Sequence, residues 1–216
     1  MKDMVVGMGE ALWDVLPEGK KIGGAPANFA YHVSQFGLNS AVVSAVGEDA
    51  LGDEIVENFT SKGLNHLIER VPYPTGTVQV EIDQAGVPQY EIKENVAWDN
   101  IPYTAHLETL ATRTKAVCFG SLAQRNVVSR NTINRFLDAM PQDDDTLVVF
   151  DVNLRQGFYN KEILCNSMKR CNILKINDEE LVTVSLMFGY PGIDLQDKCW
   201  ILLGKYNLKM LILTCG

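Results

Sequence analysis

Short apolar runs alternate with amphipathic helical patterns along most of the chain. The apolar runs predict strands at residues 4–8, 41–46, 116–119, 147–150, 173–176 and 210–213. Apolar residues spaced three or four apart predict helices at residues 26–36, 52–62, 129–140, 161–171, 178–187 and 195–206. Strands that alternate with helices are typical of an α/β fold, in which helices cover a mostly parallel central sheet.

Two segments depart from that rhythm. Apolar and polar residues alternate strictly over 77–83, and after a turn one apolar side returns over 87–92. A period of two predicts a β-hairpin with one apolar face rather than a strand–helix–strand unit. A further β segment, residues 13–22, can pair with this hairpin. We therefore expect a small β lid on the main sheet, formed by about residues 13–22 and 75–96.

The composition indicates a globular protein. The 216 residues, of which 46% are hydrophobic, suffice for one domain with a small appendage. No stretch approaches the roughly 18 apolar residues that a membrane helix needs, so we expect no membrane partner. Glu10 and Asp14 interrupt the N-terminal apolar run, which excludes a secretory signal. The cytoplasm is the simplest location for such a protein.

Charge and cysteine usage exclude further classes of protein. A formal net charge of -8 argues against nucleic acid as a partner, because phosphate binding requires a basic face. The cysteines are odd in number, widely spaced and free of any C-x-x-C pair, so neither zinc nor a disulfide framework is predicted. We expect reduced thiols at Cys118, Cys165, Cys171, Cys199 and Cys215.

Polar residues and glycines follow four of the predicted strands, where the chain leaves the sheet. They are Gly120 and Ser121, then Asp151, Asn153 and Arg155, then Asn177 and Glu180, and finally Thr214 and Gly216. Parallel α/β sheets bind ligands beyond the carboxyl ends of their strands. The sequence therefore predicts a shared ligand edge, although turn chemistry alone also places polar residues in loops.

The segment before the first long helix suits a polyhydroxylated ligand. Gly23 and Gly24 let the backbone approach a ligand closely, and Asn28 projects an amide from the first helical turn. Asp14 follows the first strand closely, and a carboxylate can accept hydrogen bonds from two sugar hydroxyls. The alternative is a tight turn, a helix start and a solvated aspartate. No G-x-x-x-x-G-K motif occurs, so any nucleotide is bound without a Walker loop.

In their order and spacing these residues resemble the PfkB, or ribokinase, family of carbohydrate kinases. The matched motifs are Gly23-Gly24 with Pro26, Asn28, Ala30, Gly37 and Gly47, a D-x-N-x-R motif at 151–155, an N-x-x-E motif at 177–180, and the start of a nucleotide-binding loop at 214–216. Residues 9–14, 75–77, 97–99 and 119–122 are similar to fructokinases in particular. The resemblance covers the whole chain.

The resemblance implies roles for the residues of the predicted sugar site. Asp14, Gly23, Gly24 and Asn28 would bind the sugar, the carboxylate and the amide through its hydroxyls. Tyr90 of the lid would supply an apolar contact to the sugar. A small-molecule sugar is therefore the expected substrate.

It also implies roles toward ATP and Mg²⁺. Arg155 would lie near the transferred phosphoryl group, where its guanidinium offsets developing negative charge. Asn177 and Glu180 would organise Mg²⁺, with Glu180 acting through water because Mg²⁺ keeps much of its hydration shell. Thr214 and Gly216 would contact ATP. The alternatives are an ion pair of Arg155 within its own motif, and Glu180 as a carboxylate favoured by the helix dipole.

The resemblance further implies a ribokinase-like, three-layer α/β/α fold with a β lid, of which residues 1–216 form the N-terminal part. Family members continue past the nucleotide-binding loop to a G-A-G-D motif that supplies the general base and an anion hole. This sequence does not contain that motif. A missing base costs about 10²–10⁴-fold and a missing anion-hole donor about 10²–10³-fold. We expect the fold to be incomplete at the C-terminus and this chain alone to lack useful kinase activity.

The expected activity of the complete enzyme is ATP-dependent phosphorylation of fructose at a primary hydroxyl. Two alternatives remain at this point. One is a kinase for another substrate, such as 2-keto-3-deoxygluconate or ribose, and the sugar acid would need an additional cation near Asn28. The other is a non-catalytic sugar-binding module. A homodimer through the β lid is the expected assembly.

Overall fold

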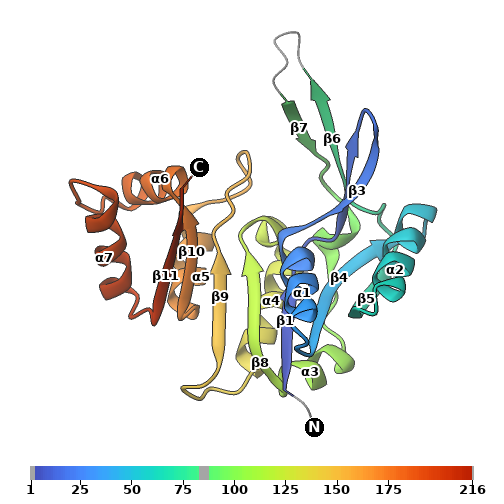
Figure 1. Cartoon of the computed structure of the whole chain (residues 1–216), viewed down its shortest axis with the longest axis horizontal. Helices are drawn as coiled ribbons and strands as arrows, with labels where there is room; N and C mark the ends of the chain where they lie inside the picture. The colour runs from blue at the N-terminus through green and yellow to red at the C-terminus, as the bar shows by residue number, and fades with distance from the viewer. Residues whose placement is uncertain (1–2, 83–87, 216) are drawn as a thin grey trace.

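The computed structural model describes residues 3–82 and 88–215, and the side chains of residues 80–90 also lie outside the described part. Within it, a seven-stranded sheet has the order β11-β10-β9-β8-β1-β4-β5, and each neighbouring pair is parallel. The strands are β1 (Met4–Met8), β4 (Ser40–Gly47), β5 (Asn65–Val71), β8 (Thr114–Gly120), β9 (Leu147–Asp151), β10 (Ile173–Asn177) and β11 (Met210–Thr214). Figure 1 shows this sheet as the centre of the molecule.

Helices lie on both faces of the sheet, although Met210 and Ile212 of β11 remain exposed. The helices are α1 (Ala25–Gln35), α2 (Ala50–Ser61), α3 (Ala105–Ala111), α4 (Val127–Ala139), α5 (Lys161–Arg170), α6 (Asp178–Phe188) and α7 (Leu195–Lys205), with the short 3₁₀ helices η1 (Ala97–Asn100) and η2 (Leu122–Gln124). Alternate residues of β4 face the two helical layers. Its residues Val42 and Val46 pack with α1 and α2, whereas Ala41 and Val43 belong to the core that α3–α7 cover. The fold is therefore the predicted three-layer α/β/α arrangement.

The chain order places a crevice at the middle of the sheet. From β1 the chain proceeds through α1 to β4 and on to β5, whereas from β8 it proceeds the other way, to β9, β10 and β11. Strands β1 and β8 are neighbours, so the direction of winding reverses between them. Loops leaving the carboxyl ends of two such strands diverge and open a crevice, which is where open α/β sheets bind ligands.

A second, four-stranded sheet stands above this crevice as the β lid (Figure 1). It consists of β2 (Leu12–Leu16), β3 (Gly19–Gly23), β6 (Thr77–Ile82) and β7 (Pro88–Ile92), in the order β3-β2-β6-β7. Both hairpins are antiparallel, and β2 pairs with β6 in parallel. The predicted pairing of the first hairpin with the second is confirmed.

All six predicted strands of the main sheet and all six predicted helices are present, within a few residues of their predicted ends. Strand β5 and helix α3 were not predicted. Strand β5 lies at the edge of the sheet and pairs with β4 alone, and four of its seven residues are polar, so no apolar run marks it. Helix α3 has seven residues, too few for a helical period to stand out.

The described cysteines are all free thiols, as predicted. Burial raises the pKa of the Cys171 thiol to about 12, so it stays protonated and packs as an apolar group. No helix in the described ranges is both long and apolar enough to cross a membrane.

Candidate active site

A cleft of about 800 Å³ opens between the β lid and the carboxyl ends of the central strands. It is lined by Glu10, Leu12, Asp14, Gly23, Gly24, Ala25, Asn28, Val78, Ile92, Leu122, Asn153, Leu154, Arg155 and Gln156. Residues from β2, β3, α1, the lid hairpin and the loop after β9 thus meet around one space. Four of the five predicted sugar-site residues and Arg155 are among them.

Asp14 projects from the lid strand β2, where it pairs in register with Lys21 of β3. Its side chain has no hydrogen-bond partner among the residues that the structure describes, and burial raises its pKa above 3.8. A Cβ added at Gly23 would lie 2.3 Å from Asp14 Oδ2. Glycine at that position therefore leaves the space that the carboxylate occupies.

Gly24 and Asn28 belong to the start of α1. Gly24 has a φ of 112°, and a Cβ there would lie 2.2 Å from the Glu10 carbonyl oxygen, so glycine is required. The backbone N–H of Asn28 donates to the Gly24 carbonyl oxygen at 3.0 Å, which closes the first helical turn. The Asn28 side chain is exposed and lines the cleft. The side-chain amide of Asn28 is thus available to a ligand.

Glu10 is a cleft residue to which the sequence analysis assigned no role. It lies two residues after β1, it is only 2% exposed, and its Oε2 has no partner in the described part of the chain. Burial raises its pKa to about 7, nearby Asp151 adds to that rise, and hydrogen bonding to the Glu10 and Ala25 amides opposes it. An acidic residue two positions after a buried parallel strand is the signal that could have identified it.

The loop after β9 carries Arg155 to the cleft. Asn153 has a φ of 42°, a left-handed conformation that asparagine tolerates better than most residues. Arg155 is exposed, and its Nη1 donates to the Leu154 carbonyl oxygen at 3.0 Å. Asp151 forms its ion pair with Lys175 of β10, at 3.0 Å, and not with Arg155. The alternative in which Arg155 serves Asp151 alone does not fit this arrangement.

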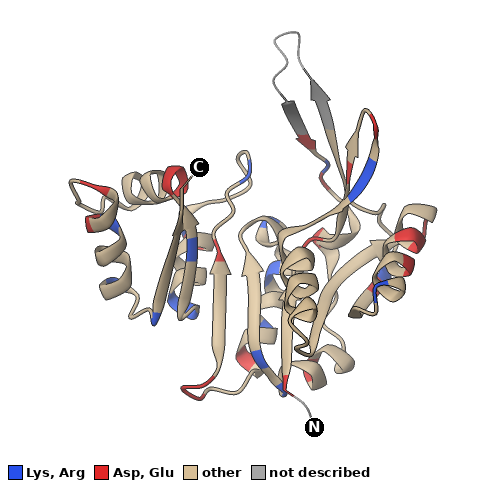
Figure 2. Ribbon diagram, in the orientation of Figure 1, with Lys and Arg blue, Asp and Glu red and all other residues tan. Residues whose placement is uncertain are grey.

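Asn177 and Glu180 form a capping box at the start of α6. The Asn177 side chain accepts a hydrogen bond from the Glu180 amide at 2.8 Å, and Glu180 Oε2 accepts one from the Asn177 amide at 3.0 Å. Glu180 Oε1 accepts from the Leu154 amide at 2.8 Å. Both carboxylate oxygens are therefore engaged by backbone donors. Figure 2 shows the acidic start of α6 at the carboxyl end of β10.

This geometry limits how the residues can hold Mg²⁺. Glu180 is buried, and its oxygens already accept hydrogen bonds from Asn177 and Leu154, an arrangement compatible with holding a cation through water. No group of three or more His, Cys, Asp or Glu side chains that could hold a metal occurs in residues 3–82 and 88–215. The described residues fit a water-mediated site better than direct coordination by a cluster of side chains.

The remaining predicted residues lie outside the cleft or outside the described part. Thr214 ends β11, is exposed, and pairs in register with Asn177 at the same carboxyl edge of the sheet. Tyr90 lies in β7, but its side chain is outside the described residues, as is Gly216. Four of the five predicted sugar-site residues and Arg155 thus line one cleft, while Asn177, Glu180 and Thr214 lie farther along the same rim.

Comparisons with known proteins identify relatives of this chain. The pfkB family carbohydrate kinase model matches residues 17–216. A fructokinase of Salmonella typhimurium is 28% identical over 226 residues, which cover 97% of this chain and 70% of that protein. A sugar kinase of Pyrococcus horikoshii is 28% identical over 198 residues, which cover 83% of this chain and 63% of that protein.

Solved structures agree with these relatives. The sugar kinase of Pyrococcus horikoshii in complex with ATP superimposes with a TM-score of 0.71 at 26% identity, over 85% of this chain and 66% of that chain. A fructokinase of Xylella fastidiosa superimposes with a TM-score of 0.82 at 19% identity, over 100% of this chain and 71% of that chain, and so shares the fold. The chain spans less than two thirds of the length of the Pyrococcus relative, at 63%.

Proposed function

The chain belongs to the pfkB family of carbohydrate kinases, and we propose that the protein transfers the γ-phosphoryl group of ATP to a primary hydroxyl of fructose. The observation that carries the proposal is the convergence of Asp14, Asn28 and Arg155 on one cleft under the lid. Fructokinases of Salmonella typhimurium, Klebsiella pneumoniae and Arabidopsis thaliana are among the relatives, at 25–28% identity. The ATP complex of the Pyrococcus sugar kinase supports ATP as the donor.

The charges around the cleft favour a neutral sugar over a sugar acid. Glu10 and Asp14 are the acidic residues of the described lining, and Arg155 is its one cation. The lid segment 80–90, whose side chains are not described, contains no Lys or Arg in its sequence. A carboxylate on the sugar would require a cation beside Asn28, and these residues supply none. Fructose and ribose therefore fit better than 2-keto-3-deoxygluconate.

The side chains that line the cleft and its rim would have different roles in the reaction. Asp14 would accept hydrogen bonds from sugar hydroxyls, and the side-chain amide of Asn28 would donate and accept them. These bonds would orient the sugar for phosphoryl transfer. Arg155 would offset the charge on the phosphoryl group during transfer. Mg²⁺, when bound with ATP, supplies further neutralisation of phosphate charge, and Glu180 would hold it through water. Glu180 also fixes the Leu154 amide and thereby the loop of Arg155.

The proposed base for the sugar hydroxyl is the aspartate of the G-A-G-D motif, which the 216 residues do not contain. We therefore propose that this chain binds sugar but turns over ATP at a rate at least about 10²–10⁴-fold below that of a complete family enzyme, since the anion hole of that motif is missing as well as the base. A non-catalytic sugar-binding role for the whole protein remains the second candidate. Phosphorylation assays on a protein that includes the G-A-G-D region separate the two, because turnover there excludes the binding module.

Sugar binding is tested by calorimetry on the 216-residue chain with fructose, ribose and 2-keto-3-deoxygluconate. We expect fructose to bind, and Asp14→Asn to weaken it at least about tenfold, since a charge-assisted hydrogen bond contributes about 1.5–3 kcal/mol. Asp145→Asn is the matched control, because Asp145 is exposed in the loop before β9. Undiminished fructose binding by Asp14→Asn, or preferential binding of the sugar acid, would contradict the proposal.

The lid is the proposed dimer interface. Strands β3 and β7 are the two edges of the lid sheet, and edge strands carry unpaired backbone donors and acceptors that can pair with another chain. Analytical ultracentrifugation tests this assembly, with proline in place of Lys20 or Ile22 of β3 as the disrupting variants. A monomer at all protein concentrations would contradict it. The need for ATP favours a cytoplasmic location.

A further inference from the structure

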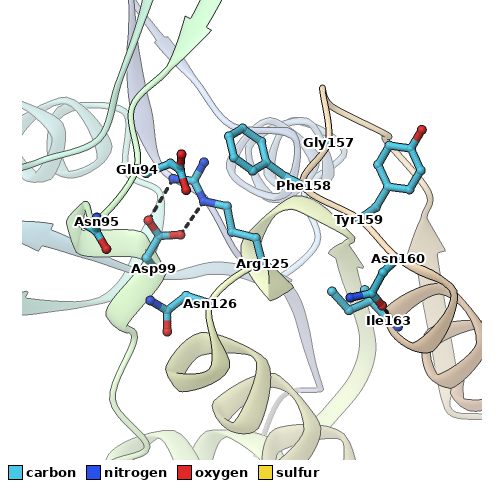
Figure 3. Close-up of a pocket in the computed structure, with 10 residues that line it drawn as sticks. All are labelled: Glu94, Asn95, Asp99, Arg125, Asn126, Gly157, Phe158, Tyr159, Asn160 and Ile163. Carbon is cyan, nitrogen blue, oxygen red and sulfur yellow. Dashed lines mark hydrogen bonds and ion pairs between the residues drawn. The ribbon is translucent and has the colours of Figure 1, made fainter.

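Arg125 is a buried cation outside the sugar cleft, and it joins four separate segments of the chain. It follows η2 directly, and its side chain is 7% exposed. Its Nε donates to Asp99 Oδ1 at 2.7 Å and its Nη2 to Asp99 Oδ2 at 2.8 Å. Nη2 also donates to the Lys93 carbonyl oxygen at 2.6 Å. Figure 3 shows the Arg125–Asp99 pair at the edge of a small pocket.

Two aromatic rings stack against the same guanidinium. The Arg125 Cζ lies 4.1 Å from the centre of the Trp98 ring and 4.5 Å from the centre of the Phe158 ring. Asp99 is itself only 2% exposed on its side chain. Removing both charges from water is costly, and the two-point hydrogen bonding and the stacking offset that cost only in this geometry. The group is therefore held in one arrangement.

One side of this group contacts the root of the lid. Lys93 directly follows β7, whose last residue Ile92 lines the sugar cleft. Gly76 directly precedes β6, and a Cβ at Gly76 would lie 2.2 Å from Trp98 Nε1. Gly76, at the start of the β6–β7 hairpin, packs on Trp98, and Lys93, at its end, accepts a hydrogen bond from Arg125. Both ends of the hairpin thus rest on the same pair of side chains.

The other side contacts the loop of Arg155. The Phe158 amide donates to the Arg155 carbonyl oxygen at 3.1 Å, so the two residues close one turn. Residues 153–156 line the sugar cleft, whereas residues 157–160 line the pocket of about 230 Å³ in Figure 3. A displacement of Phe158 would therefore move Arg155 within the cleft.

We propose that Arg125 is a positioning residue that couples the root of the lid to the Arg155 loop, so that the two walls of the cleft move together. The proposal rests on the proposed function for its purpose, because a kinase must close its lid and place Arg155 in one event. An anion-binding role for Arg125 fits less well. Glu94 and Asp99 line the same pocket, and Asp99 already neutralises the guanidinium.

The test is hydrogen–deuterium exchange on the 216-residue chain without ligand, followed at the lid root and at the Arg155 loop. Phe158→Leu removes the ring that stacks on Arg125 but keeps an apolar side chain. We expect exchange to rise roughly tenfold at residues 76–79 and 92–94, although the substitution lies in the Arg155 loop. Exchange that rises at residues 153–158 alone would overturn the proposal.

Two further variants separate coupling from packing. Phe158→Tyr keeps both the aromatic face and the volume of the side chain, and we expect it to preserve protection of the lid root. Arg125→Lys keeps the charge but loses the planar, two-point pairing, and we expect it to reproduce Phe158→Leu. Phe36→Leu, at an 84% exposed position after α1, is the control. These measurements need no sugar, so failure of the proposed substrate would leave their outcome unchanged.

Discussion

Glu180 accepts a hydrogen bond from the Leu154 amide at 2.8 Å, and through it helix α6 holds the loop that carries Arg155. The other carboxylate oxygen of Glu180 accepts a bond from the Asn177 amide at the start of the same helix. An acidic side chain near the N-terminus of α6 is favoured by the helix dipole. The N-x-x-E motif thus has a structural role in this chain whether or not Mg²⁺ is bound.

Glu180→Gln tests that role. The substitution replaces a charged acceptor of two backbone amides by a neutral side chain with one acceptor oxygen. We expect the free energy of unfolding to fall by about 1–3 kcal/mol, as measured by urea denaturation at pH 7. Glu179→Gln, at the exposed neighbouring position, should change it by less than about 0.5 kcal/mol. Equal effects of the two variants would contradict this role.

Adjacent glycines should respond differently to alanine. A Cβ at Gly24 meets the Glu10 carbonyl oxygen at 2.2 Å on a backbone with φ 112°, so we expect Gly24→Ala to cost roughly 2–4 kcal/mol. A Cβ at Gly23 meets Asp14 Oδ2 at 2.3 Å, and that atom can move aside.

Gly23→Ala should therefore spare stability and displace the Asp14 carboxylate. We expect a small change in melting temperature but at least about tenfold weaker fructose binding by calorimetry. Wild-type affinity in Gly23→Ala would show that the Asp14 carboxylate does not hold the sugar.

Glu10 should make the protein less stable as the pH rises through the neutral range. Its pKa in the folded protein is about 7, above its ordinary value of 4.5, so the folded state holds the proton more tightly. Its contribution is fully present below about pH 4.5, and it is lost as the pH rises to about 7. The loss amounts to about 3 kcal/mol when the pKa difference is converted to free energy.

Urea denaturation between pH 4.5 and 8 measures this effect. Glu10→Gln has no proton to lose, so the difference in unfolding free energy between wild type and variant should shift by that amount across the window. Glu57→Gln, exposed on α2, provides the control with no expected slope. A pH-independent difference for Glu10→Gln would contradict the burial of a neutral carboxyl.

The sequence was most informative where a single local signal decides the structure. Apolar runs identified six strands of the main sheet, including the edge strand β11, and strict alternation identified the lid hairpin. Strand β5 carries neither signal, because polar residues make up four of its seven positions, whereas β11 at the other edge is almost wholly apolar. Polar residues after the parallel strands then indicated the rim on which the cleft lies, since chain direction alone brings the carboxyl ends of the strands to one edge.

Partnerships between side chains could not be predicted in the same way. Asp151 pairs with Lys175 because β9 and β10 are neighbours in register, which the sequence does not state. Glu10 is buried because Gly24 and α1 pack over it. Arg125 and Asp99 are 26 residues apart in the chain, and their pairing depends on where η1 and η2 come to lie. Such contacts follow from the assembled fold rather than from any local pattern.

Asp49 joins the lid root to the main sheet and should make the protein sensitive to acid. Its Oδ1 accepts hydrogen bonds from the Gly52 amide and the Thr75 hydroxyl, at 2.8 and 2.6 Å, and its Oδ2 accepts one from the Thr75 amide at 2.8 Å. Burial alone would raise the pKa of Asp49, but these bonds, with nearby Arg70, hold it below 3.8. Since the folded pKa is depressed, the stabilisation is present above about pH 4 and is lost as the pH falls through the folded value.

Asp49→Asn should therefore cost most at neutral pH, about 1–2 kcal/mol in unfolding free energy, and progressively less as the pH falls below about 4. Thr75→Val keeps the shape of the side chain but removes the hydroxyl. It should lose part of the same stabilisation, because the hydroxyl donates to Asp49 Oδ1 and also accepts a hydrogen bond from the Gly47 amide at 2.9 Å. The changes in unfolding free energy of both variants are measured by urea denaturation at pH 7 and pH 3.5, with Glu57→Gln as the exposed control. If Asp49→Asn cost as much at pH 3.5 as at pH 7, the carboxylate would not be the source of the stabilisation, and the lid root would owe its position to the packing of Gly76 on Trp98 instead.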